Sequence, residues 1–176
     1  MAEQQQQGQH CGSYLIISGI SKANNVEALC FAAASHRLLP VIVGLPAMPD
    51  SHLTALEPPF AFLRFGTLGE VVEFLSQRGV PLVGIEIIDK VSVPFLDWKL
   101  PADGRGVALM PGNEGTGLSK QQKEACESFV YIPQLGAGTA SLNVHVATSL
   151  ILHRHFGSSQ TGPRGREAEG CVSKTA

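Results

Sequence analysis

The sequence predicts an α/β sandwich, in which helices cover both faces of a parallel sheet. Short, nearly continuous apolar runs alternate along the chain with segments of helical periodicity, which is the pattern of buried parallel strands and their connecting helices. Hydrophobic residues make up 44 % of the 176 residues and the net charge is only −2, so the chain is apolar enough to fold. Its length suits a single domain.

Strands are expected where apolar runs are bounded by Gly, Pro or polar residues. They are predicted over residues 14–17, 41–43, 60–63, 80–88, 106–110 and 129–132. Helices are predicted from Asn24 or Asn25 to residue 33, over residues 68–78, from Ser119 to Ser128 and over residues 141–155. Two capping boxes, Thr67 with Glu70 and Ser119 with Gln122, place the starts of the middle two helices.

The two ends of the chain lack this apolar pattern. Residues 1–12, with four consecutive glutamines, and residues 157–176, rich in Gly, Ser, Thr and charge, are predicted to be disordered. The folded domain is therefore expected to span residues 13–156. The cations of the second segment are countered by nearby glutamates, so this segment would attract nucleic-acid phosphates only weakly. Any contact with RNA or DNA would then come from a local patch or from a protein partner.

Composition also bears on the cellular location. No apolar run approaches the roughly 18 residues of a membrane span, and the Gln-rich start lacks the basic and apolar regions of a signal peptide. Four scattered cysteines without a CxxC pair are typical of reduced thiols and predict no metal site. We therefore expect a cytoplasmic protein that does not span a membrane, with the nucleus or an organelle as open alternatives.

Two glycine-rich loops follow the last two predicted strands. Residues 111–119 contain three glycines together with Asn113 and Glu114, and residues 132–140 contain two. Ligands of parallel sheets bind at the carboxyl ends of the strands, where glycine lets the backbone come close to a ligand. The order GxxGxG, without GK[ST], matches neither the dinucleotide fingerprint nor the P-loop. Ser141 and Asn143 then stand at the start of an apolar helix, where free N–H groups favour polar recognition.

These residues match a known family in order and spacing. Asn113-Glu114-Gly115 with Gly117-Leu118-Ser119, then Ile132-Pro133, then Ser141-Leu142-Asn143-Val144-x-Val146-Ala147 resemble the last two motifs of the SpoU (TrmH-like) ribose methyltransferases of the SPOUT superfamily. Residues 18–25 fit the first motif of that family. The resemblance covers residues 13–156 and is strongest over the C-terminal third.

The resemblance implies a C-terminal trefoil knot, a homodimer with the active site at its interface, and S-adenosylmethionine bound by three loops. Family enzymes methylate the ribose 2′-hydroxyl of tRNA or rRNA, so RNA is the expected substrate. By position, the cofactor-binding residues would be Glu86, Ile87, Leu109, Met110, Pro111, Gly112, Asn113, Gly115, Ile132, Pro133, Gln134, Gly136, Leu142 and Val144. The polar catalytic-site residues would be Asn25, Glu114, Ser141 and Asn143.

One stretch departs from the family's first motif, N-x-G-A-I-x-R. Glu27 stands in place of the glycine, and Phe31 in place of the arginine that is the proposed base or substrate anchor. A phenyl ring can neither accept a proton nor bind a phosphate. Either another group replaces the arginine, or the chain is a cofactor-binding module without intrinsic catalysis that acts through a partner. The candidates for a replacement are Lys22, His36, Arg37 and His145.

A third interpretation needs no relation to this family. An α/β small-molecule enzyme of flavodoxin-like arrangement could use Glu114 and a histidine. It predicts no knot and no binding of S-adenosylmethionine.

Overall fold

The computed structural model describes residues 12–44, 61–134 and 141–157. Within these ranges, seven parallel strands form one sheet in the order β3-β2-β1-β6-β4-β7-β5. The strands are β1 (Tyr14–Ser18), β2 (Leu39–Val43), β3 (Leu63–Phe65), β4 (Leu82–Ile85), β5 (Val93–Pro94), β6 (Ala108–Pro111) and β7 (Ser128–Tyr131). The helices are α1 (Ala23–Ser35), α3 (Leu68–Ser76), α4 (Lys120–Ala125) and α5 (Val144–Phe156). The predicted α/β fold with a parallel sheet is confirmed.

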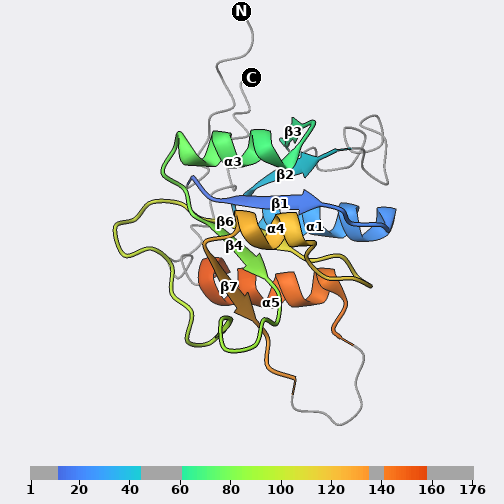
Figure 1. Ribbon diagram of the computed structural model, residues 1–176, viewed down its shortest axis with the longest axis vertical. Coiled ribbons are helices and arrows are strands. Elements are labelled where there is room, and N and C mark those ends of the chain that lie inside the picture. Colours follow the sequence, from blue (N-terminus) through green and yellow to red (C-terminus); the bar gives the residue numbers. More distant parts are fainter. Residues whose placement is uncertain (1–11, 45–60, 135–140, 158–176) are drawn as a thin grey trace, which may run out of the picture.

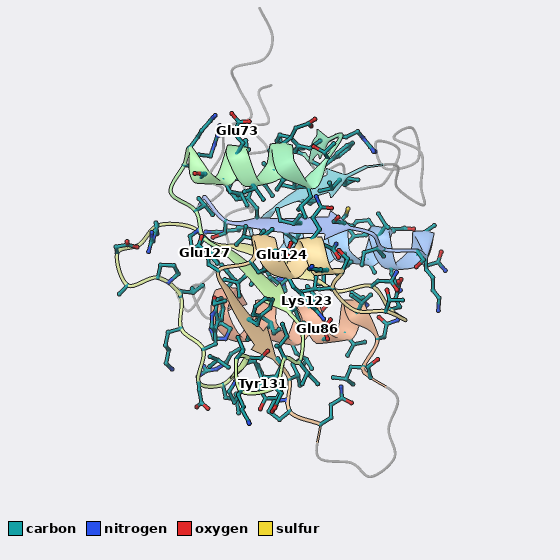
Figure 2. All side chains as sticks on the ribbon, in the orientation of Figure 1. Glu73, Glu86, Lys123, Glu124, Glu127 and Tyr131 are labelled. Atoms are coloured by element: carbon teal, nitrogen blue, oxygen red, sulfur yellow. The ribbon has the colours of Figure 1, made fainter. Side chains whose placement is uncertain are left out.

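Helices cover both faces of the sheet (Figure 1). Side chains of β1 alternate between the two faces, as the geometry of a strand requires. Leu15 and Ile17 join the core beneath α1 and α5, whereas Ile16 joins the core beneath α3. The outer sides of α3 and α4 carry exposed charged side chains, Glu73 and Glu124 among them (Figure 2). This amphipathic arrangement buries an apolar layer on each side of the sheet.

The start of α1 differs from the prediction. Its N-cap is Lys22, which makes no side-chain capping bond, and neither Asn24 nor Asn25 caps the helix. Asn25 lies in the first turn, is buried, and donates its amide to the Glu114 carboxylate. That carboxylate also accepts the backbone N–H of Lys22. A residue far along the chain thus binds the backbone at the helix start, which local sequence patterns do not reveal.

The other helix starts agree better with the sequence. α5 begins at Val144 rather than at Ser141, because the Asn143 Oδ1 atom accepts the backbone N–H of His145 at 2.8 Å and so makes Asn143 the cap. The capping box of α4 is complete. Only half of the box of α3 forms, since the Glu70 carboxylate accepts the N–H of Gly66 instead of that of the cap.

Two strand boundaries are also corrected. β4 ends at Ile85 and not at residue 88, because the backbone turns there and the Ser92 hydroxyl bonds both the Glu86 carbonyl and the Ile88 N–H. β3 starts at Leu63, so it lies later than the strand predicted over residues 60–63. The short edge strand β5 was not predicted.

The packing of α1 beside α5 positions the functional site. The N-terminal ends of the two helices meet where Asn143 Nδ2 donates to Asn25 Oδ1 at 3.3 Å. At their C-terminal ends the rings of His36 and His153 lie 6.2 Å apart. The helices therefore run parallel, and both begin at the carboxyl ends of the strands. Among the described residues, no helix is both long and apolar enough to cross a bilayer.

The trefoil knot stays a prediction. It depends on the path of residues 135–140, which lie outside the described residues. The predicted disorder of both ends likewise falls almost entirely on residues 1–11 and 158–176, outside the described ranges.

Candidate active site

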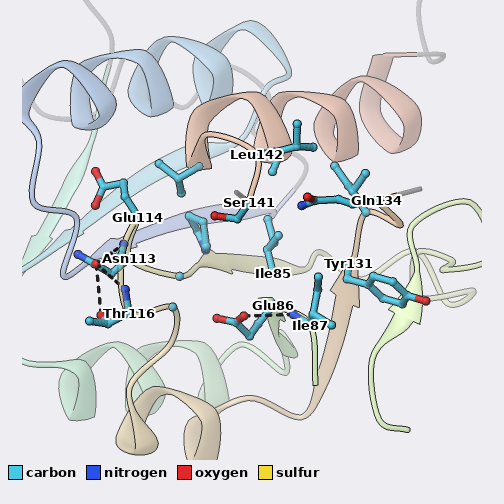
Figure 3. A pocket seen from close by; sticks show the side chains of 17 residues that line it. Ile85, Glu86, Ile87, Asn113, Glu114, Thr116, Tyr131, Gln134, Ser141 and Leu142 are labelled. Carbon is cyan, nitrogen blue, oxygen red and sulfur yellow. Dashed lines mark hydrogen bonds between the residues drawn. The ribbon is translucent and has the colours of Figure 1, made fainter. Parts of the chain in front are cut away.

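A cavity of about 350 Å³ opens at the carboxyl ends of the adjacent strands β6, β4 and β7. The loops after these strands and the start of α5 enclose it (Figure 3). Asn113 and Glu114 lie at one end of the cavity, and Tyr131 and Gln134 lie at the other. Its size falls within the range of small-molecule sites in proteins.

The charge of the cavity lining is negative. Its described residues include two carboxylates, Glu86 and Glu114, and no Lys, Arg or His. Apolar side chains, including Ile87, Leu142 and Val144, supply the rest of the wall. Such a lining favours a ligand that carries positive charge beside an apolar group, and it disfavours a polyphosphate.

The glycine-rich loop after β6 is held by its own asparagine. Asn113 and Gly117 exchange both backbone hydrogen bonds, at 3.1 and 3.0 Å. Asn113 Oδ1 accepts the N–H of Gly115 at 2.8 Å and both the N–H and the hydroxyl of Thr116 (Figure 3). Gly117 has a φ of +67°, in the left-handed region that favours glycine. The loop is therefore a closed turn with a defined shape.

The Glu86 side chain, directly after β4, joins the end of this strand to the glycine-rich loop. Its Oε2 atom accepts the N–H of Leu118 at 2.8 Å, and its Oε1 atom accepts the N–H of Ile87 at 3.2 Å. A β-carbon at Gly112 would lie 2.9 Å from this carboxylate, and one at Gly117 would overlap it. The two glycines are thus what allows a carboxylate to reach the loop backbone.

Glu114 is the centre of a polar cluster at the N-terminus of α1. Its Oε1 atom accepts Asn25 Nδ2 at 2.6 Å and the N–H of Lys22 at 3.4 Å. Its Oε2 atom accepts the N–H and the hydroxyl of Ser21, both at 3.2 Å. Asn143 donates to Asn25 and so extends the cluster to α5.

These bonds decide the ionisation of Glu114. Desolvation by itself would raise the pKa of its carboxyl group, but the hydrogen bonds from Asn25, from the loop backbone and from Ser21 outweigh it and lower the pKa to about 2. Glu114 is therefore a carboxylate throughout the physiological range. So acidic a group is a poor general base, since an effective base has a pKa near the working pH.

Most of the residues that the sequence singled out come together here. Glu86, Ile87, Pro111, Gly112, Asn113, Glu114, Gly115, Ile132, Gln134, Ser141, Leu142 and Val144 line the cavity. Asn25 and Asn143 stand beside it, linked to Glu114. Pro133 lines an adjoining hollow with Ile87 and Tyr131. Leu109 and Met110 are fully buried in β6 and do not line the cavity. Gly136 lies outside the described residues.

The structure narrows the groups that could replace the arginine. Phe31 lies on α1, less than two turns beyond Asn25. His36 and Arg37 follow the far end of α1, a helix of 13 residues and so about 20 Å long. Lys22 and His145 remain near the cluster, because their backbone N–H groups donate to Glu114 and to Asn143.

The two cysteines that the structure describes, Cys30 and Cys126, do not line this cavity. Burial, together with the nearby charge of Glu27, raises the pKa of the Cys30 thiol to about 12, and burial raises that of Cys126 to about 12. A thiol with so high a pKa is a poor nucleophile. Cys30 is buried in the core beneath α1 and α5, and Cys126 packs against the core beneath α3.

Several residues of the site were not singled out from the sequence. Ser21 contacts Glu114 and Asn113, while Thr116 and Tyr131 line the cavity. Ser21 lies inside the stretch that fits the first motif, and Thr116 lies inside the glycine-rich loop. Their position in those segments could have indicated that they belong to the site. The contacts of Ser21, which span 92 and 93 residues of sequence, could not be inferred.

The fold of this chain has known counterparts. The model of the SpoU rRNA methylase family matches residues 13–153, so the chain belongs to this family. This confirms the resemblance found in the three motifs.

Two curated relatives illustrate the match. The 23S rRNA (guanosine-2′-O-)-methyltransferase RlmB of Coxiella burnetii is 28 % identical over 145 residues, which are 79 % of this chain and 56 % of that protein. A putative TrmH family tRNA/rRNA methyltransferase of Staphylococcus saprophyticus is 26 % identical over 159 residues, covering 87 % of this chain and 61 % of that protein. The chain thus spans a little over half the length of these relatives.

Solved structures share the fold. The A. aeolicus TrmH/SpoU tRNA modifying enzyme superimposes with a TM-score of 0.68 at 22 % identity, covering 82 % of this chain and 73 % of that one. The SpoU methyltransferase AviRb from Streptomyces viridochromogenes, in complex with the cofactor AdoMet, gives 0.67 at 22 % identity, covering 82 % and 57 %.

Proposed function

We propose that this chain binds S-adenosylmethionine and transfers its methyl group to a ribose 2′-hydroxyl of tRNA or rRNA. The observation that carries the proposal is the cavity at the carboxyl ends of β6, β4 and β7, which has two carboxylates and no cation among its described lining residues. Membership of the SpoU family and the activities named for the curated relatives support it.

The residues present fit this cofactor. When bound, S-adenosylmethionine supplies an electrophilic methyl group on a positively charged sulfonium, together with an ammonium group. Glu86 and Glu114 provide a matching negative potential, and Ile87, Leu142 and Val144 provide an apolar wall for an adenine. The backbone of residues 112–115 and 132–134 would hold the polar edges. The comparison structure with AdoMet has the same fold.

The polar cluster would orient the substrate hydroxyl. Glu114 remains ionised, so it holds Asn25 and the start of α1 and does not donate a proton. The Asn25 and Asn143 side chains are fixed in one orientation, because each accepts one hydrogen bond and donates another. Ser141 adds a hydroxyl at the cavity wall. Fixed dipoles beside a reacting hydroxyl are what positioning catalysis requires.

A specific observation favours a second candidate function. Phe31 replaces the arginine of the family motif, so the chain could bind the cofactor without transferring the methyl group and act through a protein partner. Lys22 and His145 are the groups in place to compensate. An imidazole can accept a proton near neutral pH, whereas an ammonium can only neutralise negative charge.

Transfer of tritium from the labelled methyl donor to total tRNA and rRNA separates the two functions. The assay compares the wild type, Phe31→Arg and Asn143→Ala, each with and without cell extract. Label in RNA with purified wild type supports the enzyme, and its loss in Asn143→Ala supports the role given to that residue. Label only with Phe31→Arg or only with extract supports the binding module.

We extend the proposal to a homodimer that pairs through α5. Val146 and Leu150 on α5 are 42 % and 44 % exposed and lie four residues apart, so they form an apolar stripe along one side of the helix. Light scattering tests this stripe. Leu150→Glu should shift a dimer toward the monomer, while Val72→Glu, an exposed site on α3 across the sheet, should leave the dimer intact. A dimer unchanged by Leu150→Glu would place the interface elsewhere.

RNA binding and location complete the proposal. The chain has 13 Lys and Arg residues against 15 Asp and Glu, so the domain by itself offers weak attraction to phosphates. RNA affinity would then come from a protein partner, or from a segment that corresponds to the part of the curated relatives outside the match. A cytoplasmic location, where tRNA and rRNA are found, belongs to this proposal.

A further inference from the structure

Two chains of hydrogen bonds end on the Glu114 carboxylate. From one side, Asn143 Nδ2 donates to Asn25 Oδ1 at 3.3 Å, and Asn25 Nδ2 donates to Glu114 at 2.6 Å. From the other side, Asn113 Nδ2 donates to the Ser21 hydroxyl at 2.7 Å, and that hydroxyl donates to Glu114 at 3.2 Å. Every donor in both chains points toward the carboxylate.

Ser21 occupies the junction of two loops. It follows β1, whereas Asn113 and Glu114 follow β6, and more than 90 residues of sequence separate them. Its hydroxyl has a single hydrogen. Because Asn113 donates to the hydroxyl oxygen, that hydrogen is left for Glu114. Asn113 also donates to the Gly19 carbonyl at 2.8 Å, so both of its amide hydrogens bind the loop after β1.

We propose that Ser21 is a positioning residue for Glu114 and that Asn113 sets the direction of the Ser21 hydroxyl bond. The loop that lines the cavity and the loop that begins α1 then act as one unit. This inference deepens the proposed function, because it names the residues that hold Glu114 beside the proposed cofactor. Its consequence for catalysis rests on that proposed function. Its geometric part is testable without any RNA.

Two substitutions act on this junction in different ways. Ser21→Ala removes the hydroxyl and leaves the backbone N–H that also bonds Glu114. Asn113→Asp keeps the oxygen that accepts from Gly115 and Thr116, but it replaces the donor by a second acceptor. The Ser21 hydrogen would then turn to the new carboxylate and away from Glu114. Both changes therefore withdraw the same hydrogen bond, one by deletion and one by reversal.

The experiment follows the titration of the Glu114 carboxyl group by carbon-13 NMR in the full chain. With a hydrogen bond to the carboxylate lost, the pKa of Glu114 should rise in Ser21→Ala. It should rise further in Asn113→Asp, where the introduced carboxylate also repels Glu114. Ser21→Thr should restore the wild-type titration, since it keeps the hydroxyl. Thr116→Val removes only a bond to Asn113 Oδ1 and should leave the titration unchanged. Ser21 is exposed, so its replacement spares the core.

Activity supplies a second readout. With labelled S-adenosylmethionine and RNA, kcat should fall about tenfold in Ser21→Ala, which is the loss expected for one hydrogen bond to a charged group, with Ser21→Thr close to wild type. Ser35→Ala, at the far end of α1, serves as the control for the rate. The Kd of S-adenosylmethionine, from calorimetry, should change less than threefold in Ser21→Ala.

The outcomes separate the two proposals. Unchanged titration of Glu114 in both Ser21→Ala and Asn113→Asp would overturn the positioning role, whatever the protein binds. If the pKa of Glu114 rose in Ser21→Ala but stayed unchanged in Asn113→Asp, the positioning role of Ser21 would stand. The role given to Asn113 in directing the Ser21 hydroxyl would be refuted. Absence of S-adenosylmethionine binding to the wild type would refute the proposed function, and the titration would still decide the geometry.

Discussion

Replacing Asn25 by aspartate would set a second carboxylate against Glu114. Asn25 Nδ2 lies 2.6 Å from Glu114 Oε1, and the new oxygen of the isosteric side chain would take its place. Two unit charges at that separation repel by about 1.6 kcal/mol in a dielectric of about 80 and by about 6 kcal/mol in one of about 20. Because the pair is partly buried, we expect Asn25→Asp to lower the free energy of unfolding by about 2 to 4 kcal/mol at neutral pH.

The loss depends on pH with a definite sign. The introduced aspartate would bind a proton in the folded state to relieve the repulsion, so its folded pKa would lie above its unfolded value of about 3.9. The stability of such a group is fully present below the unfolded pKa and is lost as the pH rises through the folded pKa. Asn25→Asp should therefore approach the wild type below about pH 4 and become less stable toward neutrality.

Urea unfolding followed by circular dichroism between pH 4 and pH 8 measures this directly. Asn25→Ala is the matched control, because it removes the same hydrogen bonds without adding a charge and should lose stability about equally across that range. A difference between Asn25→Asp and the wild type that did not vary with pH would show that the two side chains are not paired, and the cluster would have to be redrawn.

Two further predictions concern the loop and its carboxylates. Gly117→Ala should weaken binding of S-adenosylmethionine at least tenfold. The φ of Gly117 is +67°, which strains an alanine by about 1 to 2 kcal/mol, and the new β-carbon would displace the Glu86 carboxylate. Calorimetry measures the Kd, with Gly69→Ala on α3 as the control, and an unchanged Kd in Gly117→Ala would contradict the role of Glu86. Glu114→Gln should be less stable than the wild type at neutral pH. The folded pKa of Glu114 is depressed from 4.5 to about 2, so its contribution is present above pH 4.5 and is lost as the pH falls through about 2. The two proteins should therefore converge in urea midpoint across that interval, and a gap that stays constant would argue against the hydrogen-bonded carboxylate.

The fold was predictable where the pattern is local. Tyr14 to Ile17 form a continuous apolar run that is buried on both faces of a parallel sheet, and Ser119 with Gln122 form a complete capping box. Strand ends were less predictable. β4 ends before Glu86, where the Ser92 hydroxyl bonds the turning backbone, and the Glu86 carboxylate accepts the Leu118 N–H, a contact across 32 residues.

The candidate site was predictable in its residues but not in its connections. Glycines at 112, 115 and 117 indicated a loop that approaches a ligand, and the cavity forms there. Asn24 or Asn25 was expected to cap a helix from residue type alone, yet the amide of Asn25 donates to Glu114 and neither residue is the cap. A polar side chain at the start of a helix can bond either the nearby backbone or a partner far along the chain. The tertiary structure determines which of these bonds forms.

The central claim is that the cavity and its cluster serve methyl transfer to a ribose 2′-hydroxyl. The most direct measurement incubates purified protein with the tritiated methyl donor and RNA, then hydrolyses the RNA in alkali, which does not cleave beside a methylated 2′-oxygen. Label recovered in alkali-resistant dinucleotides, and absent with Asn143→Ala, is the predicted result. Label in mononucleotides would place the methyl on a base, and no label with either the wild type or Phe31→Arg would contradict the claim.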